Sequence, residues 1–547
     1  MRSPHTLFSS AGASRTGAAA GRRPLGAVLA ALTLLAALLV VLVPAVRADA
    51  VPAGPAVQPQ AAIDPDATTS IQVHKFAQPE QLGEPSSGLE QDTTGLTPVA
   101  GATFTATKVP GIDTTTDAGR QAAADLSVAE AIAAIGSAAP AATETTDAAG
   151  DAPLTGLGVA LYLVQETFTP TGYVASDPFL VLLPLTNPGT GDNWLYTVHV
   201  YPKNAHVTAT IDVDDAAAVS AADAVRWTSH TTIPRRTSIT AYVVRNLVDT
   251  RLTLLDAASD IQVSLECSGC DSGLDASDFT TSIVTYDGHE TIEVVFSEAG
   301  RAKLATARAA DPDAKIDVSY RTAVTAALAN ASGADPGVNG TFTNEVRLFP
   351  DSNTLAGRGT AASDATSTKF GPLEIIVHEK GNDANRIPGA RFQLFLTAED
   401  AANRTNPVTV WGVSEWTTDA DGSIVIDGLR FSDFANGLDR DSSDPLYRTY
   451  YIRMIEVPAG WTGSTDPIGL VVNSSTEAQV ALVELYRAEE GGSTGGLALT
   501  GGQIAGAWVL GAVLVVLGIL ALLARRRKRE DSTADSATST GDDPGAR

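Results

Sequence analysis

Short runs in which hydrophobic and polar residues alternate recur along the central part of the chain. A period of two places the hydrophobic side chains on one face of a β-strand, and β-branched residues favour that conformation. Glycine, proline, aspartate and asparagine bound the runs, which predicts short strands joined by turns. The clearest runs are Ser70–Lys75, Val159–Glu166, Phe179–Leu183, Thr281–Tyr286 and Glu290–Phe296. The pattern predicts a mainly β protein made of sandwiches.

Helical patterns are few. Two alanine-rich stretches, Asp125–Ile135 and Ser297–Arg308, each predict one helix, because alanine has the highest helix propensity. Residues 136–151 are mostly small and polar and are interpreted as a flexible insertion between strands.

Two longer hydrophobic runs stand near the ends of the chain. Arginines precede the apolar stretch Leu25–Val46, and the small residues Ala48 and Ala50 are spaced as at a signal-peptidase site, so residues 1–50 are predicted to be a secretory signal peptide. Residues 503–524 are apolar over a length that, at about 1.5 Å per residue, matches a hydrocarbon core ~30 Å thick. The basic cluster Arg525–Arg529 follows directly, which predicts a transmembrane helix with residues 525–547 in the cytoplasm.

Charge and cysteine content narrow the class of the exported part. The net charge of −26 makes nucleic acid an unsuitable partner. The two cysteines, Cys267 and Cys270, have the spacing of metal or redox sites, but no second pair accompanies them, and a loop disulfide is the favoured interpretation. The seven histidines form no ligand set, and no nucleophile-elbow, phosphate-loop or zincin pattern occurs. No metal, no cofactor and no enzymatic activity are therefore predicted.

A repeat divides the exported part into three. Two segments near its start resemble two near its end, and their separations are similar: 65 residues from Gly101 to Glu166, and 67 from Gly389 to Glu456. Two related sandwiches, 51–204 and 369–490, should therefore flank a different middle sandwich, 205–368, with 491–502 as a linker. The matching pairs are Ala100–Phe104 with Pro388–Phe392 and Leu161–Tyr173 with Tyr451–Trp461.

Three motifs lie between the signal peptide and the cytoplasmic tail. The segment from Trp194 to Lys203 and Asn204 resembles the pilin motif, in which a tryptophan is followed at fixed spacing by Val-x-Val-Tyr-Pro-Lys. Glu166, followed by Pro170 and Gly172-Tyr173, resembles the E-box. The pentapeptide Leu497, Ala498, Leu499, Thr500 and Gly501, just before the apolar run, resembles a sortase sorting signal cut between Thr500 and Gly501. An ordinary single-span membrane protein would explain the helix without the pentapeptide.

Together these motifs resemble one family along the chain from export to anchor. The family is that of sortase-assembled, wall-anchored major (shaft) pilins of Gram-positive bacteria with isopeptide-forming Ig-like domains. The resemblance implies three tandem Ig-like or Cna-type β-sandwich domains between the signal peptide and the sorting signal. It also implies a structural subunit of a surface fimbria that serves adhesion.

The resemblance also implies how subunits join. A class C (pilin) sortase would hold the Thr500 carbonyl as a thioester, and Lys203 of an identical subunit would attack it. A housekeeping sortase would then attach the fibre, with any accessory pilins, to peptidoglycan, after a transient membrane-anchored precursor. Ala498 stands where proline is commoner, which leaves open which sortase accepts the motif.

An internal amide is implied within the first domain. In the family, a lysine, an asparagine and a glutamate meet in the sandwich, and here these would be Lys75, Asn204 and Glu166. Burial disfavours both charges, so a neutral amine can attack an amide carbon polarised by a protonated carboxyl, and ammonia leaves. The alternative is a plain Lys75–Glu166 salt bridge at a sheet edge.

The other two domains are expected to lack this bond. In the middle domain Asn344 has the acceptor's place, but its opening strand has no lysine and Asn246 replaces the aspartate of the family. In the C-terminal domain Glu456 is expected in the E-box place and Glu379 in the place of Lys75. Lys380 lies one residue further on and should point away from the core, because side chains alternate faces along a strand.

Two alternative functions are weighed against the shaft pilin. A minor or tip pilin, or wall-anchored adhesin, normally lacks the reactive lysine or carries a large extra binding domain, and this chain has the lysine without the extra domain. A wall-anchored hydrolase would need a paired-carboxylate or nucleophile arrangement, which the sequence does not contain.

Overall fold

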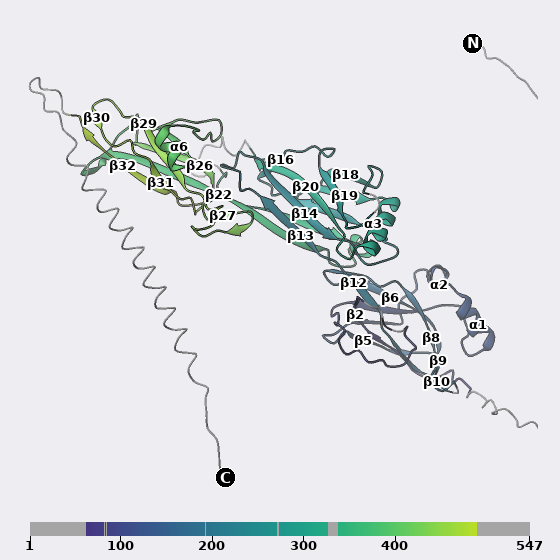
Figure 1. The fold of residues 1–547 in the computed structure, drawn as a ribbon. Helices are drawn as coiled ribbons and strands as arrows, with labels where there is room; N and C mark the ends of the chain where they lie inside the picture. The colour runs from purple at the N-terminus through teal and green to yellow at the C-terminus, as the bar shows by residue number, and fades with distance from the viewer. Residues whose placement is uncertain are drawn as a thin grey trace, which may run out of the picture.

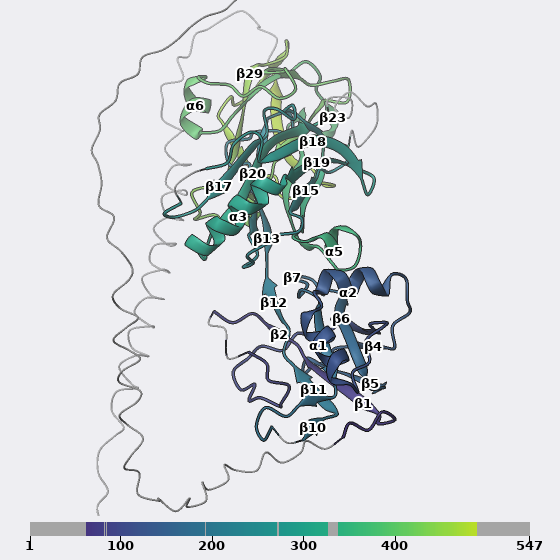
Figure 2. The same cartoon turned by 90° about the vertical axis from the view of Figure 1, so that its right-hand side faces the viewer.

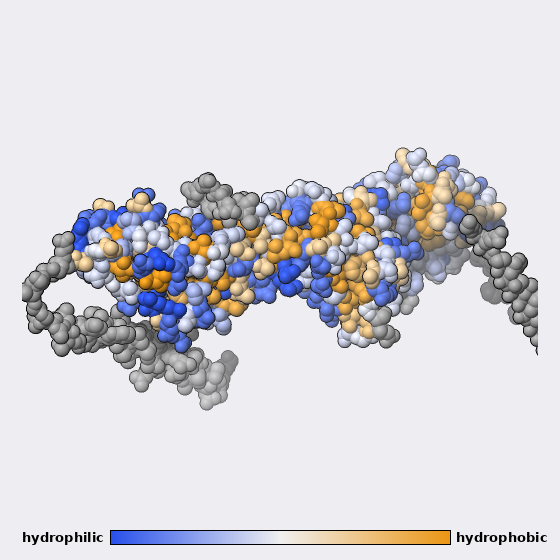
Figure 3. Space-filling model, turned by 90° about the horizontal axis from the view of Figure 1, so that it is seen from above, coloured by the Kyte–Doolittle hydropathy of each residue, from blue (hydrophilic) through white to orange (hydrophobic). Residues whose placement is uncertain are grey.

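The computed structural model describes residues 62–80, 83, 85–191, 193–270, 273–325 and 337–488. Its strands form three consecutive groups along an elongated body, with the N-terminal group at one end and the C-terminal group at the other (Figure 1). Hydrophobic and hydrophilic residues are interspersed along the visible face of this body (Figure 3). The prediction of a mainly β protein is confirmed. Among the described residues, no helix is both long and apolar enough to cross a membrane. The expected signal peptide, sorting pentapeptide and transmembrane helix lie outside these ranges.

The N-terminal group packs two sheets around a core that includes Ile71, Phe104 and Leu154. One sheet has the order β11-β1-β5 and the other β4-β3-β6-β8, while the short strands β2, β12 and β7 extend the assembly toward the middle group. Its elements are β1 (Thr69–His74), β2 (Phe76–Ala77), β3 (Thr103–Lys108), α1 (Asp117–Asp125), α2 (Val128–Ile135), β4 (Ala142–Thr145), β5 (Asp151–Leu157), β6 (Ala160–Phe168), β7 (Tyr173–Val174), β8 (Phe179–Leu183), β9 (Leu185–Thr186), β10 (Trp194–Leu195), β11 (Thr197–Val200) and β12 (Lys203–His206).

The first and last strands of this group are parallel neighbours. Ile71 of β1 pairs with Val198 of β11, and Ala77 of β2 pairs with Asn204 of β12. Residues about 130 positions apart in the chain are thereby brought side by side, because a parallel pair needs a long connection. Lys75, between β1 and β2, consequently lies beside the strand that carries Asn204.

The helix expected at Asp125–Ile135 is present as α2, which begins three residues later because Ser127 caps it in a capping box with Glu130. The helix before it, α1, was not expected, and one expectation for this group is corrected. The segment expected to be a flexible insertion is ordered: β4 pairs with β3. The Thr146 hydroxyl accepts the N–H of Ala102 and donates to a backbone carbonyl, so this side chain fixes the loop.

The middle group also has two sheets around one core, which includes Trp227, Tyr242 and Phe342. One sheet has the order β13-β14-β20-β16 with β17 beside β20, and the other runs β18-β19-β15-β21. The helix expected at Ser297–Arg308 is present as α3, and Ser297 caps it by accepting the N–H of Gly300. The elements are β13 (Ala209–Asp214), β14 (Val225–Thr232), β15 (Val243–Leu247), β16 (Leu252–Leu254), β17 (Gln262–Glu266), β18 (Phe279–Tyr286), β19 (His289–Phe296), α3 (Glu298–Ala310), β20 (Lys315–Val324), β21 (Gly340–Phe349) and α5 (Ser352–Leu355).

One long strand joins the middle and C-terminal groups. The first half of β22 pairs with β21, and the second half pairs with β26 and β32. The elements of the C-terminal group are β22 (Ala362–Glu379), β23 (Asn382–Arg386), β24 (Arg391–Phe395), α6 (Ala398–Asn403), β25 (Trp416–Thr417), β26 (Ser423–Arg430), β27 (Phe434–Ala435), β28 (Leu438–Asp439), β29 (Tyr450–Glu456), β30 (Trp461–Thr462), β31 (Ile468–Leu470) and β32 (Gln479–Arg487).

The N-terminal and middle groups are joined by the chain running from β12 into β13 (Figure 2). Further contacts reinforce this connection. The backbone of Thr169 pairs with Gly359, and Arg235 donates to the carbonyl oxygens of Pro79 and Glu80. The loop that follows β6 is thus held against the middle group.

Candidate functional site

Three polar side chains meet in the core of the N-terminal group. Lys75 Nζ lies 2.8 Å from Glu166 Oε2, and Asn204 Nδ2 lies 2.7 Å from Glu166 Oε1. Glu166, on β6, thus bridges the lysine that follows β1 and the asparagine on β12. All three are buried, with exposed fractions of 4% for the glutamate and 0% for the other two.

Burial sets the chemistry of this trio. The pKa of Lys75 is lowered from 10.5 to about 8, because its burial disfavours the ammonium more strongly than the neighbouring Glu166 favours it. The ring of Phe104 lies 5.2 Å from Nζ and helps to exclude solvent. The side-chain oxygen Oδ1 of Asn204 has no hydrogen-bond donor among the described residues. A buried amine whose pKa is lowered to about 8 is neutral in a larger fraction of molecules near neutral pH, and the neutral amine is the nucleophilic form.

Ser176 is a fourth member of the site, and no sequence pattern indicated its role. Its backbone N–H lies 2.9 Å from Glu166 Oε2, and its Oγ lies 3.0 Å from the same oxygen. Ser176 follows β7, which pairs with β12 through Val174 and Ala205. No motif could reveal its role, because the contact depends on how β7 is placed beside the strand of Asn204.

Lys203 stands at the start of β12, directly before Asn204. Its side chain is half-buried, and Nζ donates to the carbonyl oxygen of Tyr201 at 3.3 Å. Burial lowers the pKa of Lys203, and among the described residues no carboxylate forms an ion pair with it. At the start of the same motif the guanidinium carbon of Arg120, on α1, lies 4.3 Å from the ring centre of Trp194.

The middle group has two buried asparagines where the sequence placed them. Asn344 accepts the N–H of Asp249 at 2.9 Å and donates to the Tyr320 hydroxyl at 3.2 Å. Asn246 is equally buried, but neither atom of its amide has a hydrogen-bond partner within the described part of the chain. The opening strand β13 contributes no lysine to them.

In the C-terminal group the two assigned glutamates do not occupy the expected places. Glu456 is on the surface, with 58% of its side chain exposed, and pairs with Arg391. Glu379 accepts from Asn385 and Arg487. Lys380 Nζ donates to the Tyr486 hydroxyl at the surface.

Backbone register explains this correction. Phe104 of β3 pairs with Glu166, and the repeat-related Phe392 of β24 pairs with Met454. In both groups the register shifts next to this pair, so that Thr103 pairs with Phe168 and Arg391 pairs with Glu456. Glu456 therefore corresponds to the exposed Phe168 and not to Glu166. The spacing from Gly389 to Met454 is 65 residues, as from Gly101 to Glu166. The shared glutamate identity at a spacing of 67 was therefore misleading.

Two further positions follow from the same comparison. The backbone carbonyl oxygen of Asn204 accepts the N–H of Gln78, three residues after Lys75. In the C-terminal group the backbone carbonyl oxygen of Leu485 accepts the N–H of Lys380, three residues after Val377. The backbone N–H of Lys75 donates to the carbonyl oxygen of Gly150, and that of Val377 donates to the carbonyl oxygen of Gly422. Val377, Met454 and Leu485, all buried in one core, therefore occupy the places of the N-terminal trio.

Cys267 and Cys270 form a disulfide after β17, as the favoured interpretation predicted. Cys267 also packs against α3, because its Sγ lies 3.8 Å from the carbonyl oxygen of Ala307. Leu497, Ala498, Leu499, Thr500 and Gly501 lie outside the described residues.

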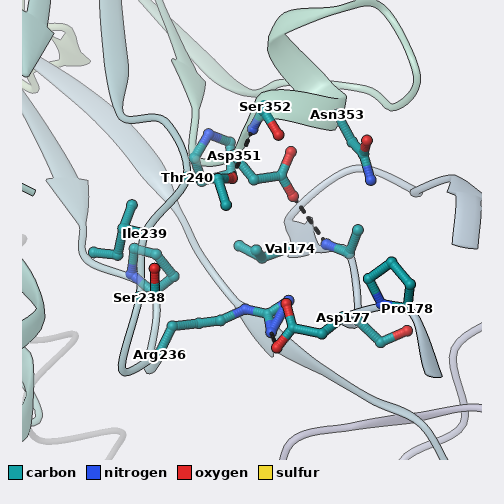
Figure 4. Close-up of a pocket in the computed structure, with 14 residues that line it drawn as sticks. Val174, Asp177, Pro178, Arg236, Ser238, Ile239, Thr240, Asp351, Ser352 and Asn353 are labelled. Atoms are coloured by element: carbon teal, nitrogen blue, oxygen red, sulfur yellow. Dashed lines mark hydrogen bonds and ion pairs between the residues drawn. The ribbon is translucent and has the colours of Figure 1, made fainter. Parts of the chain in front are cut away.

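A cavity of about 170 Å³ lies between the N-terminal and middle groups (Figure 4). Ser176 and Asp177 line it from the N-terminal side, and Arg236 and Asp351 line it from the middle group. The Asp351 carboxylate accepts the N–H of Ala175 at 2.9 Å, and Arg236 pairs with Asp177 at 3.0 Å. Polar contacts thus cross the boundary on both sides of Ser176.

Comparison with known proteins agrees with this architecture. Residues 66–205 match the family described as the Gram-positive pilin subunit D1, N-terminal domain. The chain is 28% identical to the fimbrial subunit type 1 of Actinomyces viscosus, over 93% of this chain and 98% of that protein. It is 26% identical to the fimbrial subunit type 2 of Actinomyces naeslundii, over 87% of this chain and 92% of that protein.

A solved structure shows the same fold. The major pilin SpaA of Corynebacterium diphtheriae matches with a TM-score of 0.58 at 24% identity, over 76% of this chain and 99% of that one. The family match covers the segment that holds Lys75, Glu166 and Lys203, and the two relatives extend over most of the chain. Residues 66–205 thus match a Gram-positive pilin domain, and over most of its length the chain is similar to fimbrial subunits, a class of structural proteins and not of enzymes.

Proposed function

We propose that this protein is the backbone subunit of a covalently polymerised pilus, in which Lys203 of one subunit is joined to Thr500 of the next. The observation that carries the proposal is the position of Lys203. Its half-buried amine lies at the junction of β11 and β12, its pKa is lowered by burial, and it donates a hydrogen bond to a carbonyl oxygen. Such an amine reaches the neutral, nucleophilic form more readily than a lysine that is paired with a carboxylate.

The chemistry is a transpeptidation in two steps. A class C sortase cysteine attacks the Thr500 carbonyl, the bond to Gly501 breaks, and the residues from Gly501 onward leave. The neutral Lys203 amine then attacks the thioester, its extra proton departs, and the cysteine leaves as a thiolate. Each cycle leaves one new amide bond and regenerates the sortase. A housekeeping sortase would transfer the last subunit to peptidoglycan, giving a wall-anchored fibre that serves adhesion.

A second amide is proposed inside the N-terminal domain, between Lys75 and Asn204. One proton moves from the Lys75 ammonium to Glu166, which leaves a neutral amine beside the Asn204 amide carbon. Attack of Nζ on that carbon, with transfer of a proton from Glu166 Oε1 to Nδ2, releases ammonia. The excess proton on Nζ returns to Glu166. Support comes from the two contacts of Glu166, 2.8 Å to the attacking nitrogen and 2.7 Å to the leaving one.

Replacing Lys203 by arginine tests the polymer bond. Arginine stays protonated at all working pH values and is a poor nucleophile, so the Lys203→Arg variant should yield monomer without polymer. The exposed Lys108 of the same domain gives a matched control, and Lys108→Arg should polymerise normally. An immunoblot of cell-wall extract measures both. A high-mass ladder that persists in Lys203→Arg would assign the linkage to another lysine.

A further inference from the structure

The segment Ala175–Asp177 connects the buried trio to the middle domain. Ser176 donates two hydrogen bonds to Glu166, while the residues on either side of it contact the middle domain. The N–H of Ala175 donates to Asp351, and Asp177 pairs with Arg236. Figure 4 shows these contacts reaching across the boundary. The position of Ser176 is thus fixed by the way the two domains meet.

The Asp351 carboxylate is a firm anchor for this segment. Only 6% of Asp351 is exposed, and its other oxygen accepts the N–H and hydroxyl of Thr354 in the first turn of α5. Its acceptor capacity is used on both sides of the domain boundary. A second tie acts on the strand of Glu166 itself, because Thr169, just after β6, exchanges backbone hydrogen bonds with Arg358 and Thr360.

The distribution of donors around Glu166 has a chemical consequence. Oε2 accepts from Lys75 Nζ and from both donors of Ser176, whereas Oε1 accepts only from Asn204 Nδ2 among the described residues. A carboxyl group that is given one proton will carry it on the oxygen with fewer donors pointing at it. With Ser176 in place that oxygen is Oε1, which faces the leaving nitrogen of the proposed condensation.

We propose that Ser176 is a positioning residue for the Lys75–Asn204 condensation, and that docking of the middle domain sets its position. The inference rests on the proposed internal amide. In this order of events, the middle domain first docks against the N-terminal domain, and the amide between Lys75 and Asn204 forms only afterwards. Arg236 contributes in the same direction, because its charge lowers the pKa of Lys75 from across the boundary.

Four variants of the full-length chain, produced without sortase, test the proposal. The measurement is the rate at which the cross-linked Lys75–Asn204 tryptic peptide appears after a pulse of labelled amino acids. Ser176→Ala should slow this rate about tenfold, because it removes the hydroxyl donor to Oε2 that helps to keep the proton of Glu166 on Oε1. Ser176→Thr keeps the hydroxyl and should restore most of the rate. A purely structural loss would not be reversed by threonine alone.

Two aspartates of the middle domain form the second matched pair. Asp351→Ala removes the anchor of Ala175 and should slow cross-linking at least as much as Ser176→Ala. Asp256→Ala removes a comparably buried carboxylate that accepts the N–H of Arg321 away from the boundary, and its rate should match wild type. Circular dichroism of each variant identifies failure to fold.

The outcomes separate failure of the role of Ser176 and of domain docking from failure of the internal amide itself. If Ser176→Ala cross-links at the wild-type rate, the positioning role is wrong. If Asp351→Ala folds and cross-links as fast as Asp256→Ala, docking does not control the step. If the wild-type chain contains no Lys75–Asn204 peptide, the internal amide itself is wrong. A Lys75→Ala chain, which cannot form the peptide, provides the reference for that case.

Discussion

Val377 occupies in the C-terminal domain the backbone position that Lys75 occupies in the N-terminal domain. The N–H of Lys75 donates to the carbonyl of Gly150, and that of Val377 donates to the carbonyl of Gly422. The carbonyl oxygen of Lys75 accepts from Val99, and that of Val377 accepts from Ile387. The same framework thus holds an amine in one domain and an isopropyl group in the other.

The first prediction is a single internal condensation per chain. Met454 and Leu485 replace the other two members of the trio, so the C-terminal domain has neither an amine nor an amide at this place. Asn344 has an acceptor amide but no nearby lysine on β13. The intact mass of the reduced residues 51–490, made without sortase, should fall short of the sequence mass by one ammonia.

Lys75→Ala should abolish that deficit, whereas Lys380→Ala should retain it. Lys380 is the C-terminal lysine nearest in sequence to the expected place, and it lies at the surface. A deficit of two or three ammonia molecules would show that the other domains react as well. Complete absence of a deficit in wild type would leave Lys75 and Glu166 as an ordinary buried ion pair.

The second prediction concerns stability. An amide between Lys75 and Asn204 closes a long loop, and by analogy with disulfides it should stabilise the domain by about 4 kcal/mol. Lys75→Met keeps an unbranched side chain in the buried site but cannot form the bond. Denaturant unfolding followed by intrinsic fluorescence should show the N-terminal domain losing about that amount of free energy. If Lys75→Met unfolds at the wild-type denaturant concentration, the cross-link contributes nothing.

The third prediction is a fall in condensation rate at high pH. The reactive arrangement needs one proton shared between Lys75 and Glu166, so that the amine is neutral while the carboxyl is protonated. Because the pKa of Lys75 is about 8, raising the pH through 8 removes the proton that Lys75 and Glu166 share. At pH 9 only about a tenth of the chains would retain it.

Refolding of unlinked chain from denaturant measures this dependence. The first-order rate of ammonia loss should be flat between pH 6 and pH 7 and fall about tenfold per unit above 8. Acid quenching followed by mass measurement gives the rate at each pH. A rate that rises through pH 8 would mean that the carboxylate form of Glu166 is sufficient and acts as a base.

Much of the fold could be predicted from the sequence, because two-residue periodicity depends only on which face of a strand is buried. The strand that carries Glu166 and the strand that Lys75 follows were predicted in this way, and the trio was expected from its resemblance to a family. Ser176 could not be found, because its contact depends on the placement of β7 beside β12. Met454 was missed because the two glutamates were matched by identity at unequal spacings, whereas the strand pairing places Met454 opposite Phe392 as Glu166 lies opposite Phe104.

The last prediction is that replacing Asn246 stabilises the middle domain. Both amide atoms of Asn246 are buried without a hydrogen-bond partner among the described residues, and an unpaired buried polar group costs about 1–3 kcal/mol. Asn246→Leu has a similar shape and removes the polar atoms, so the free energy of unfolding should rise by a value in that range. Thermal unfolding of residues 51–490 measures it.

Asn344→Leu is the matched control for this change. Asn344 is buried two strand positions from the residue that pairs with Asn246, but its amide bonds the N–H of Asp249 and the Tyr320 hydroxyl. Replacing it leaves both partners unsatisfied, so the domain should lose stability, by about 1–3 kcal/mol. Opposite signs for two asparagine-to-leucine changes in one core would tie the effect to hydrogen bonding and not to volume. If both changes destabilise the domain equally, the Asn246 amide has a partner that compensates for its burial.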